Sequence, residues 1–182
     1  GTPTQEQIKA YTLVLQGHIA LAMAKFPKGT TGLQIDALAR QFLWHHSMDY
    51  CHGTGHGVGH CSSVHESPPR INTYTSTVLE SGMVVSNEPG FYKDGEFGIR
   101  IESLIMVKNS SINSSINNFL EFETLTVIPM CRNLIDPNIL SKDQLKWLNE
   151  YHQKCWSALS PLLTEEDDKR TLDWLNRQCQ SF

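Results

Sequence analysis

Two stretches near the start of the chain combine a helix-start signal with hydrophobic residues spaced three and four apart. Thr4-Gln-Glu-Gln7 and Thr31-Gly-Leu-Gln34 each match a capping box, in which side chains satisfy the first free backbone amides of a helix. The hydrophobic stripes that follow comprise Ile8, Tyr11, Leu15, Ile19, Ala22 and Phe26 in the first stretch, and Ile35, Leu38, Ala39, Phe42 and Leu43 in the second. The pattern predicts two helices, the first ending at Pro27-Lys-Gly29, with Glu6 and Asp36 exposed on their polar faces.

The middle of the chain has the alternating pattern and the glycine content of β-structure. Helical periodicity stops after Cys51, and residues 83–88 predict a strand. Residues 98–107 form the clearest strand pattern, because isoleucine and valine alternate with Arg100 and Glu102, which must then point to the same side. A polar tract at 108–118 contains Ser-Ser-Ile-Asn twice in tandem and predicts an exposed hairpin connection before a strand over 119–128.

The last quarter of the chain returns to helical periodicity. Ser141-Lys-Asp-Gln144 is a third capping box, and Thr164 with the acidic run after it predicts the start of a further helix. Trp147, Trp156 and Trp174 are a large aromatic load for this region, and we expect it to pack on the main body or on another subunit. We expect one domain at residues 1–130 and a helical tail at residues 131–182.

Composition and charge narrow the classes of partner. A chain of 182 residues that is 40% hydrophobic can bury a core. Its formal net charge of −4 and its lack of Lys/Arg runs argue against a positively charged surface that binds nucleic acid or anionic membranes. No apolar stretch approaches the roughly 20 residues that span a bilayer. The five scattered cysteines favour a reducing compartment, the cytoplasm. Because the first residue is Gly1, we expect a processed chain or a piece of a longer one.

Two polar clusters carry the candidate chemistry. One is the glycine-rich run around His52 and His56, and the other comprises Glu88, Arg100 and Glu102. Since an unpaired carboxylate among isoleucines is costly, Glu102 needs a cationic partner, either Arg100 in a salt bridge or a divalent cation. Histidine and carboxylate ligands together predict a metal hydrolase. Because only two carboxylates are well placed, either the site holds one ion or further acidic ligands precede Gly1.

At this point the sequence resembles a known family. The motifs closely resemble the aminopeptidase P branch of the "pita-bread" metallopeptidases of family M24. The strings that carry the resemblance are His52-Gly-Thr-Gly-His-Gly-Val-Gly59, Val64-His-Glu66, Ser86-Asn-Glu-Pro-Gly90, Phe97-Gly-Ile-Arg-Ile-Glu102, Phe122-Glu-Thr-Leu-Thr-Val-Ile-Pro129, Asn133-Leu-Ile-Asp136 and Trp147-Leu-Asn-Glu-Tyr-His152. The resemblance covers essentially the whole chain and implies an α+β fold: part of a pita-bread domain, with a curved antiparallel sheet, helices on its outer face and a helical tail.

The resemblance also implies roles for particular residues. It makes His56, Glu88 and Glu102 three of five ligands of two divalent metal ions, most simply Mn²⁺, with Glu102 bridging and Glu88 also shuttling a proton. Arg100 would hold a ligand carboxylate in place. The family's other two ligands are aspartates that precede a segment like Gly1-Thr-Pro-Thr4. We therefore expect this chain to be the carboxy-terminal portion of such an enzyme, and to be inactive by itself.

The substrate side is likewise implied by the resemblance. His52 would shape the pocket around the proline and the scissile bond, and His65 would donate a hydrogen bond to the peptide carbonyl. The expected activity is release of the N-terminal residue from peptides with proline in second position, by a protein that forms a homodimer through its tail. Two alternatives stay open: a prolidase limited to dipeptides, and a non-catalytic pita-bread module that binds peptides or proteins.

Overall fold

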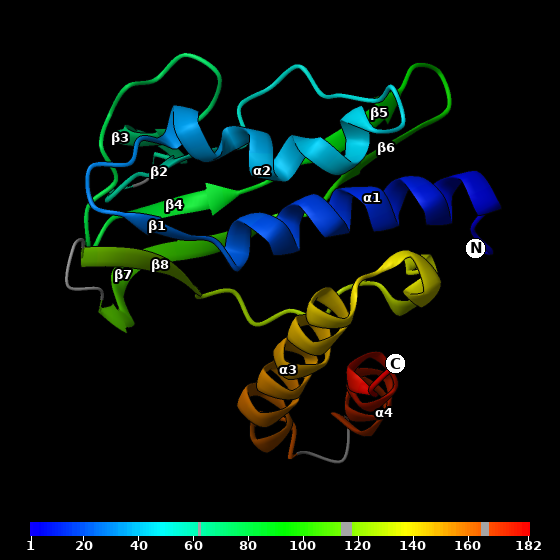
Figure 1. Cartoon of the computed structure of the whole chain (residues 1–182). Helices are drawn as coiled ribbons and strands as arrows, with labels where there is room; N and C mark the ends of the chain where they lie inside the picture. The colour runs from blue at the N-terminus through cyan, green and yellow to red at the C-terminus, as the bar shows by residue number, and fades with distance from the viewer. Residues whose placement is uncertain (62, 114–117, 165–167) are drawn as a thin grey trace. The chain divides into compact units, whose positions relative to one another are not determined.

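The structure is a computed structural model that describes residues 1–61, 63–113, 118–164 and 168–182. Its elements fall into two compact units. One comprises residues Leu13–Thr126, and the other joins Gly1–Thr12 to Val127–Phe182. The first helix, α1 (Gln5–Ala22), contributes residues to both units. Both helices and strands are present in the order shown in Figure 1, which confirms the α+β class expected from the sequence.

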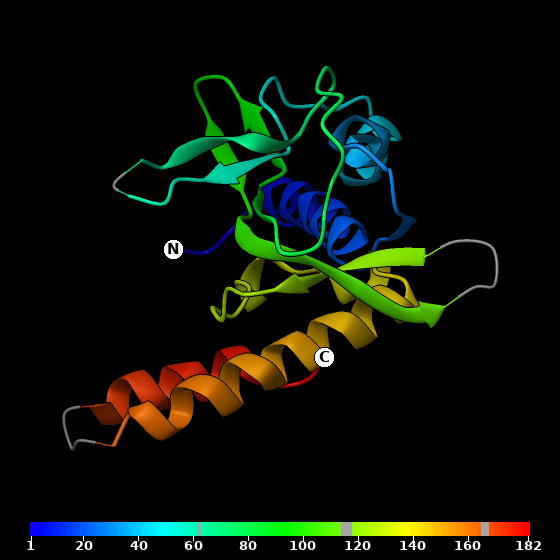
Figure 2. The same ribbon diagram turned by 90° about the vertical axis from the view of Figure 1, so that its left-hand side faces the viewer.

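A six-stranded sheet forms the frame of the larger unit. Its strand order is β1-β8-β7-β4-β2-β3, and every described pair of neighbours is antiparallel. The strands are β1 (Lys25–Pro27), β2 (Gly55–Val58), β3 (His65–Ile71), β4 (Val84–Asn87), β7 (Ser103–Asn113) and β8 (Asn118–Thr124). A separate hairpin pairs β5 (Gly90–Lys93) with β6 (Phe97–Arg100). The sheet is curved and antiparallel, as expected (Figure 2).

The core of this unit lies between the sheet and two helices. Helix α2 (Gly32–Trp44) begins with the predicted capping box, in which Thr31 and Gln34 bond to each other's backbone. Its apolar stripe and the end of α1 meet the inward side chains of the strands, because alternate strand residues point to one face. The buried cluster contains Leu21, Phe26, Ile35, Ala39, Ile71, Leu79, Val85, Ile105, Val107, Leu120 and Phe122.

Several predicted boundaries are wrong in this unit. Helix α1 ends at Ala22, and Phe26 lies in strand β1 opposite Leu120, since an apolar residue can continue a helical stripe by chance. Residues 98–107 are not one strand, because β6 ends at Arg100 and β7 begins at Ser103. Strand β7 also extends to Asn113, where an exposed connection was expected. The rest of that tract, residues 114–117, lies outside the described residues.

The second unit contains the helical region. Helix α3 (Lys142–Leu159) begins with the predicted capping box at Ser141 and Gln144, and it lies beside α4 (Lys169–Cys179) in both views (Figures 1 and 2). Short 3-10 helices connect the elements: η1 (Arg132–Leu134), η2 (Pro137–Ile139) and η3 (Ser160–Leu162). Part of the acidic run expected to open the last helix, residues 165–167, lies outside the described residues. Among the described helices, none has the length and hydropathy needed to cross a membrane.

Candidate metal centre

Three side chains from separate segments of the larger unit converge on one point. His56 lies on β2, Glu88 follows β4 directly, and Glu102 lies between β6 and β7. One donor atom from each of the three lies within 4.8 Å of the other two, and no other such group of His, Cys, Asp or Glu occurs in the part of the chain that the structure describes. The structure therefore brings together the three residues that the sequence suggested as metal ligands.

Nε2 of His56 faces the carboxylate of Glu88. Its Nε2 atom lies 3.1 Å from Oε1 of Glu88, while its Nδ1 atom lies 2.9 Å from the carbonyl oxygen of Gly57. When Nδ1 carries the proton and donates to Gly57, Nε2 and Oε1 both present lone pairs to each other. Two acceptors at this distance are stable only with a proton or a cation between them. The two atoms are therefore placed as two ligands of one metal ion would be.

Glu88 is held by a set of short hydrogen bonds. Its Oε1 atom accepts from Oγ of Ser86 at 2.8 Å, and its backbone amide donates to the carbonyl oxygen of Thr54 at 2.8 Å. Ser86 Oγ also accepts from the backbone amide of His56 at 2.9 Å. Ser86 thus bonds to both candidate ligands at once. Such supporting bonds orient ligands and typically contribute to metal affinity.

Arg100 lies beside both carboxylates. Its Nε atom is 3.0 Å from Oε2 of Glu102 and 3.8 Å from Oε2 of Glu88. The Glu102 side chain is 40% exposed, so the expectation of a carboxylate surrounded by isoleucine side chains is wrong. It fails because the strand breaks at Ile101 and Glu102, which frees the carboxylate to turn toward solvent and Arg100. The salt bridge that the sequence offered as an alternative is present, and it does not preclude a cation at the same place.

Of the two histidines expected on the substrate side, His65 lies beside His56, and His52 is linked to Arg100 through Tyr92. His65 lies on β3, and its ring centroid is 4.2 Å from that of His56. His52 precedes β2, and its Nε2 atom lies 2.8 Å from the hydroxyl of Tyr92 on β5. Sequence patterns do not single out Tyr92, because its partner His52 is distant along the chain and strand tyrosines commonly lie in a core or at the surface. Tyr92 therefore adds a second polar group to the His52 side of the site.

Two glycines allow the strands beside His56 to approach closely. A Cβ atom on Gly55 would lie 2.0 Å from the carbonyl oxygen of Ser86, and one on Gly57 would lie 2.5 Å from that of Glu66. Real Cβ atoms do not come so near to an oxygen. Close packing of the strands therefore requires glycine on both sides of His56, which explains why the segment 52–59 is rich in glycine.

The donor set fits a divalent transition-metal ion. One imidazole nitrogen and two carboxylates are ligands that Mn²⁺ and Zn²⁺ both accept. Donors bound at about 2.1 Å to a shared ion lie up to about 4.2 Å apart, so separations within 4.8 Å need only small movements to close on one ion or on a bridged pair. The excess negative charge of two carboxylates, met by a single guanidinium, also favours a cation here.

The site lies in a region of wide sequence similarity to known proteins. The sequence model of metallopeptidase family M24 matches residues 1–109, and one described as the C-terminal region of peptidase M24 matches residues 118–182. A protein of Coprinopsis cinerea named "Probable Xaa-Pro aminopeptidase P" is 49% identical over 183 residues, which cover 98% of this chain and 29% of that protein. The chain thus spans less than a third of the curated relatives that it matches first.

Solved structures show the same similarity in three dimensions. X-prolyl aminopeptidase from Caenorhabditis elegans, described as a cytosolic enzyme with a di-nuclear active site, superposes with a TM-score of 0.91 at 39% identity, over 99% of this chain and 29% of that one. Xaa-Pro dipeptidase from Bacillus anthracis has a TM-score of 0.57 at 33% identity, over 71% of this chain and 33% of that one. The pita-bread fold expected from the sequence is confirmed by these relatives.

Proposed function

Because the chain belongs to metallopeptidase family M24, we propose that it supplies three ligands of a two-metal centre in an Xaa-Pro aminopeptidase. The whole protein would release the N-terminal residue from peptides that have proline in second position. The observation that carries this proposal is the convergence of His56, Glu88 and Glu102, whose donor atoms lie within 4.8 Å of one another. Relatives that share half of the sequence and bear that name support the substrate class.

The peptide bond that precedes proline determines what the site must do. The nitrogen of a bond to proline carries no hydrogen, so an enzyme cannot recognise or activate this bond through a backbone N–H. A pair of divalent cations, which we propose to be Mn²⁺, would polarise the scissile carbonyl and make a nucleophile of water near neutral pH. The protein side chains must then orient the peptide, accept the proton of the attacking water and protonate the leaving nitrogen.

The chain's residues divide these tasks. Glu88, which stands against His56 and is held by Ser86, accepts the proton from the attacking water and passes it to the proline nitrogen. His65, adjacent to His56, donates to the peptide carbonyl as negative charge develops on its oxygen. His52 shapes the pocket around the proline, and Arg100 keeps the Glu102 carboxylate turned toward the centre.

Titration with Mn²⁺ tests the ligand assignment on the 182-residue chain itself. We expect one class of saturable binding that is lost in Glu88→Gln and kept in Glu123→Gln, a carboxylate on β8 that pairs with Lys108. We also expect no hydrolysis of an Xaa-Pro tripeptide by this chain, because three ligands leave a two-metal centre short of carboxylates. The whole protein should hydrolyse the tripeptide when loaded with Mn²⁺. Equal binding by both variants would refute the ligand assignment.

Substrate length separates the proposed activity from its alternatives. The aminopeptidase structure covers 99% of the chain, including the helical region, whereas the dipeptidase covers 71%. We therefore expect the whole protein to cleave tripeptides and longer peptides as well as dipeptides. Cleavage of dipeptides alone would indicate a prolidase, and metal binding without any hydrolysis would indicate a non-catalytic module.

We further propose that the protein is a cytoplasmic homodimer. The C. elegans relative is described as cytosolic, which supports the compartment. The helical region supports self-association, since Trp174 on α4 is 46% exposed and large exposed aromatic residues are enriched in interfaces. Sedimentation of the whole protein should give twice the chain mass, and a Trp174→Ala variant should shift it toward the monomer.

A further inference from the structure

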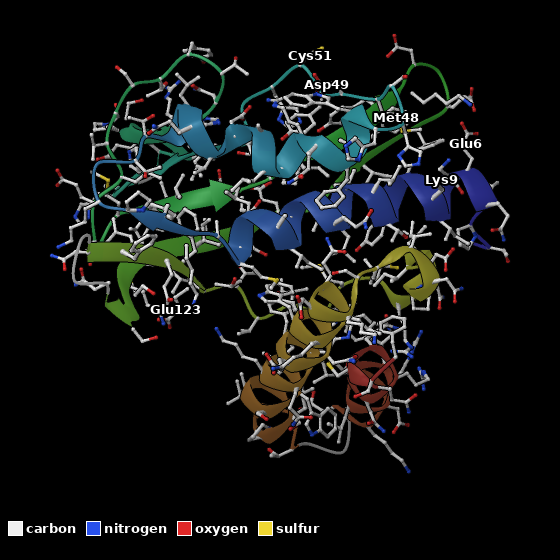
Figure 3. All side chains as sticks on the ribbon, in the orientation of Figure 1. Glu6, Lys9, Met48, Asp49, Cys51 and Glu123 are labelled. Carbon is white, nitrogen blue, oxygen red and sulfur yellow. The ribbon has the colours of Figure 1, made fainter. Side chains whose placement is uncertain are left out.

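Ten residues, 45–54, connect α2 to β2, and the last six of them, Asp49–Thr54, form a loop that carries His52. Asp49 and Cys51 are labelled on this loop in Figure 3. Residues 49–54 belong to no helix or strand, so the polar groups of their backbone need partners outside regular secondary structure, and side chains supply several of them. Those side chains belong to α2 and to the loop itself.

Arg40 on α2 holds the loop through several hydrogen bonds. Its Nη1 atom donates to the carbonyl oxygen of Tyr50 and to Oδ1 of Asp49, both at 2.8 Å, and its Nη2 atom donates to the carbonyl oxygen of His52 at 2.9 Å. The Arg40 side chain is only 5% exposed. A buried guanidinium that binds three successive parts of one loop fixes the path of that loop.

Asp36 completes the anchor one helical turn earlier. Its Oδ2 atom accepts from Nε of Arg40 at 2.6 Å, and its Oδ1 atom accepts from Oγ1 of Thr54 at 2.5 Å. Asp36 is 3% exposed, so the expectation of a surface residue is wrong. A carboxylate on a helix with an arginine four residues later is usually a solvated pair, and only the fold reveals that this one is buried.

Tyr50 links the two halves of this network. The Arg40 guanidinium lies 3.9 Å above the centre of the Tyr50 ring, and the Tyr50 hydroxyl lies 2.6 Å from Oγ1 of Thr54. Since the single Thr54 hydroxyl proton goes to Asp36, the Tyr50 hydroxyl is the donor to Thr54. The bonds form a closed circuit through Asp36, Arg40, Tyr50 and Thr54.

This circuit reaches both sides of the candidate centre. On one side it holds the backbone of His52, whose ring lies 4.8 Å from the ring of Tyr50. On the other side the carbonyl oxygen of Thr54 accepts from the backbone amide of Glu88 at 2.8 Å. A substrate-facing histidine and a proposed ligand are thus tied to the same buried ion pair.

We propose that Arg40 and Asp36 are positioning residues, which set the place of His52 relative to Glu88 and so determine how the peptide is held. A buried ion pair contributes little net stability compared with apolar packing, but it can specify one arrangement of the groups bonded to it. This inference rests on the proposed function, because it takes His52 as a substrate-binding group. It adds residues on the far side of the loop that do not touch the substrate.

A double-mutant cycle in the whole metal-loaded protein tests the positioning role. Arg40→Lys keeps the charge but cannot reproduce the set of bonds that the planar guanidinium makes. We expect it to lower kcat/KM for an Xaa-Pro tripeptide about 10- to 100-fold with the metal content unchanged, as for other groups that orient site residues. In a His52→Ala background the same change should cost less than about two-fold, because the group that it positions is gone.

The matched control is Arg132→Lys in the other unit. Arg132 also donates to two backbone carbonyls, those of Gln180 and Ser181, and its guanidinium lies 3.8 Å above the ring of Phe182. The Arg132→Lys variant should keep the wild-type kcat/KM for the tripeptide. Tyr50→Phe is a milder second variant for the case that Arg40→Lys does not fold. It removes only the hydrogen bond of the Tyr50 hydroxyl to Thr54 and should also lower kcat/KM. A loss that is equally large with and without His52 would overturn the proposal.

Hydrogen exchange supplies a readout that does not depend on activity. In Arg40→Lys we expect the amide of Glu88 and those of residues 50–54 to exchange at least about 10-fold faster, while amides of β7 and β8 keep their protection. Unchanged exchange at Glu88 and in the loop would also overturn the positioning role. If the wild-type protein has no Xaa-Pro peptidase activity, the proposed function fails, and the exchange result still decides whether Arg40 orders the loop.

Discussion

Nε2 of His56 and Oε1 of Glu88 lie 3.1 Å apart, although His56 lies on β2 and Glu88 follows the end of β4. Two ligands that bind one ion at about 2.1 Å and at right angles are separated by about 3 Å. The pair therefore already has the spacing of neighbouring ligands. Ser86, which bonds to the backbone of one and to the carboxylate of the other, maintains that spacing through protein contacts.

Replacing the histidine of this pair should weaken metal binding. In His56→Gln the imidazole nitrogen is lost, and we expect the affinity of the chain for Mn²⁺, measured by calorimetric titration, to fall at least about 10-fold. His45→Gln, an exposed residue at the end of α2, is the control and should bind as the wild type does. If the two variants bind Mn²⁺ equally well, His56 is not a ligand.

Replacing Arg100 distinguishes two roles for this residue. If it orients Glu102, to which it lies at 3.0 Å, Arg100→Gln should lower Mn²⁺ affinity about 10-fold despite removing a positive charge. If it only neutralises the carboxylates, affinity should rise, because the ion no longer competes with the guanidinium. Lys25→Gln, which removes the same charge from β1 at the other edge of the sheet, corrects for the general electrostatic effect. We expect the first result, and tighter binding would contradict it.

Local signals in the sequence predicted much of the fold. The capping boxes at Thr4, Thr31 and Ser141 are all present, because they depend only on side chains three residues apart. The sequence pattern continues the first helix to Pro27-Lys-Gly29, whereas α1 ends at Ala22. A three-residue strand follows that helix, and its pairing with β8 is a long-range contact that no local pattern encodes.

The candidate site is likewise only partly predictable from the sequence. The approach of His56, Glu88 and Glu102 was expected because their motifs resemble those of a known family, not because spacing alone placed them together. Asp36 and Arg40 were missed as parts of the site region, because a helical pair four residues apart looks the same in sequence whether exposed or buried. Burial is set by the loop that folds over α2, and it can only be read from the structure.

A methyl group at Gly55 should be far more damaging than one at Gly53. The Cβ atom of Gly55→Ala would lie 2.0 Å from the Ser86 carbonyl oxygen, whereas at Gly53 the nearest atom would be at 3.4 Å, an ordinary contact. We expect Gly55→Ala to lower the free energy of unfolding by about 3 kcal/mol and to abolish Mn²⁺ binding, since β2 must move away from β4. Gly53→Ala should change stability by less than about 1 kcal/mol. Urea denaturation of both variants measures the difference, and equal stabilities would show that β2 can shift freely.

Acid should destabilise the helical unit through His152. This residue lies buried on α3 and its Nε2 atom accepts the backbone amide of Met130 at 3.2 Å, which requires an unprotonated nitrogen. Burial, aided by the positive charge of Arg132, lowers the pKa of His152 from 6.5 to about 4. The unfolded chain therefore binds a proton that the folded chain does not, and stability that is complete above pH 6.5 is lost as the pH falls toward 4.

The loss should amount to about 2 to 3 kcal/mol between pH 7.5 and pH 4 for this one group. His152→Gln keeps an oxygen that can accept from Met130 but cannot titrate, so its stability should depend less steeply on pH. Urea denaturation at several pH values, followed by tryptophan fluorescence, to which Trp147 contributes by its stacking on Tyr151 in the same helix, measures the slope. His46→Gln, an exposed histidine, should keep the wild-type slope. A wild-type slope in His152→Gln as well would mean that other groups dominate the acid sensitivity of this unit.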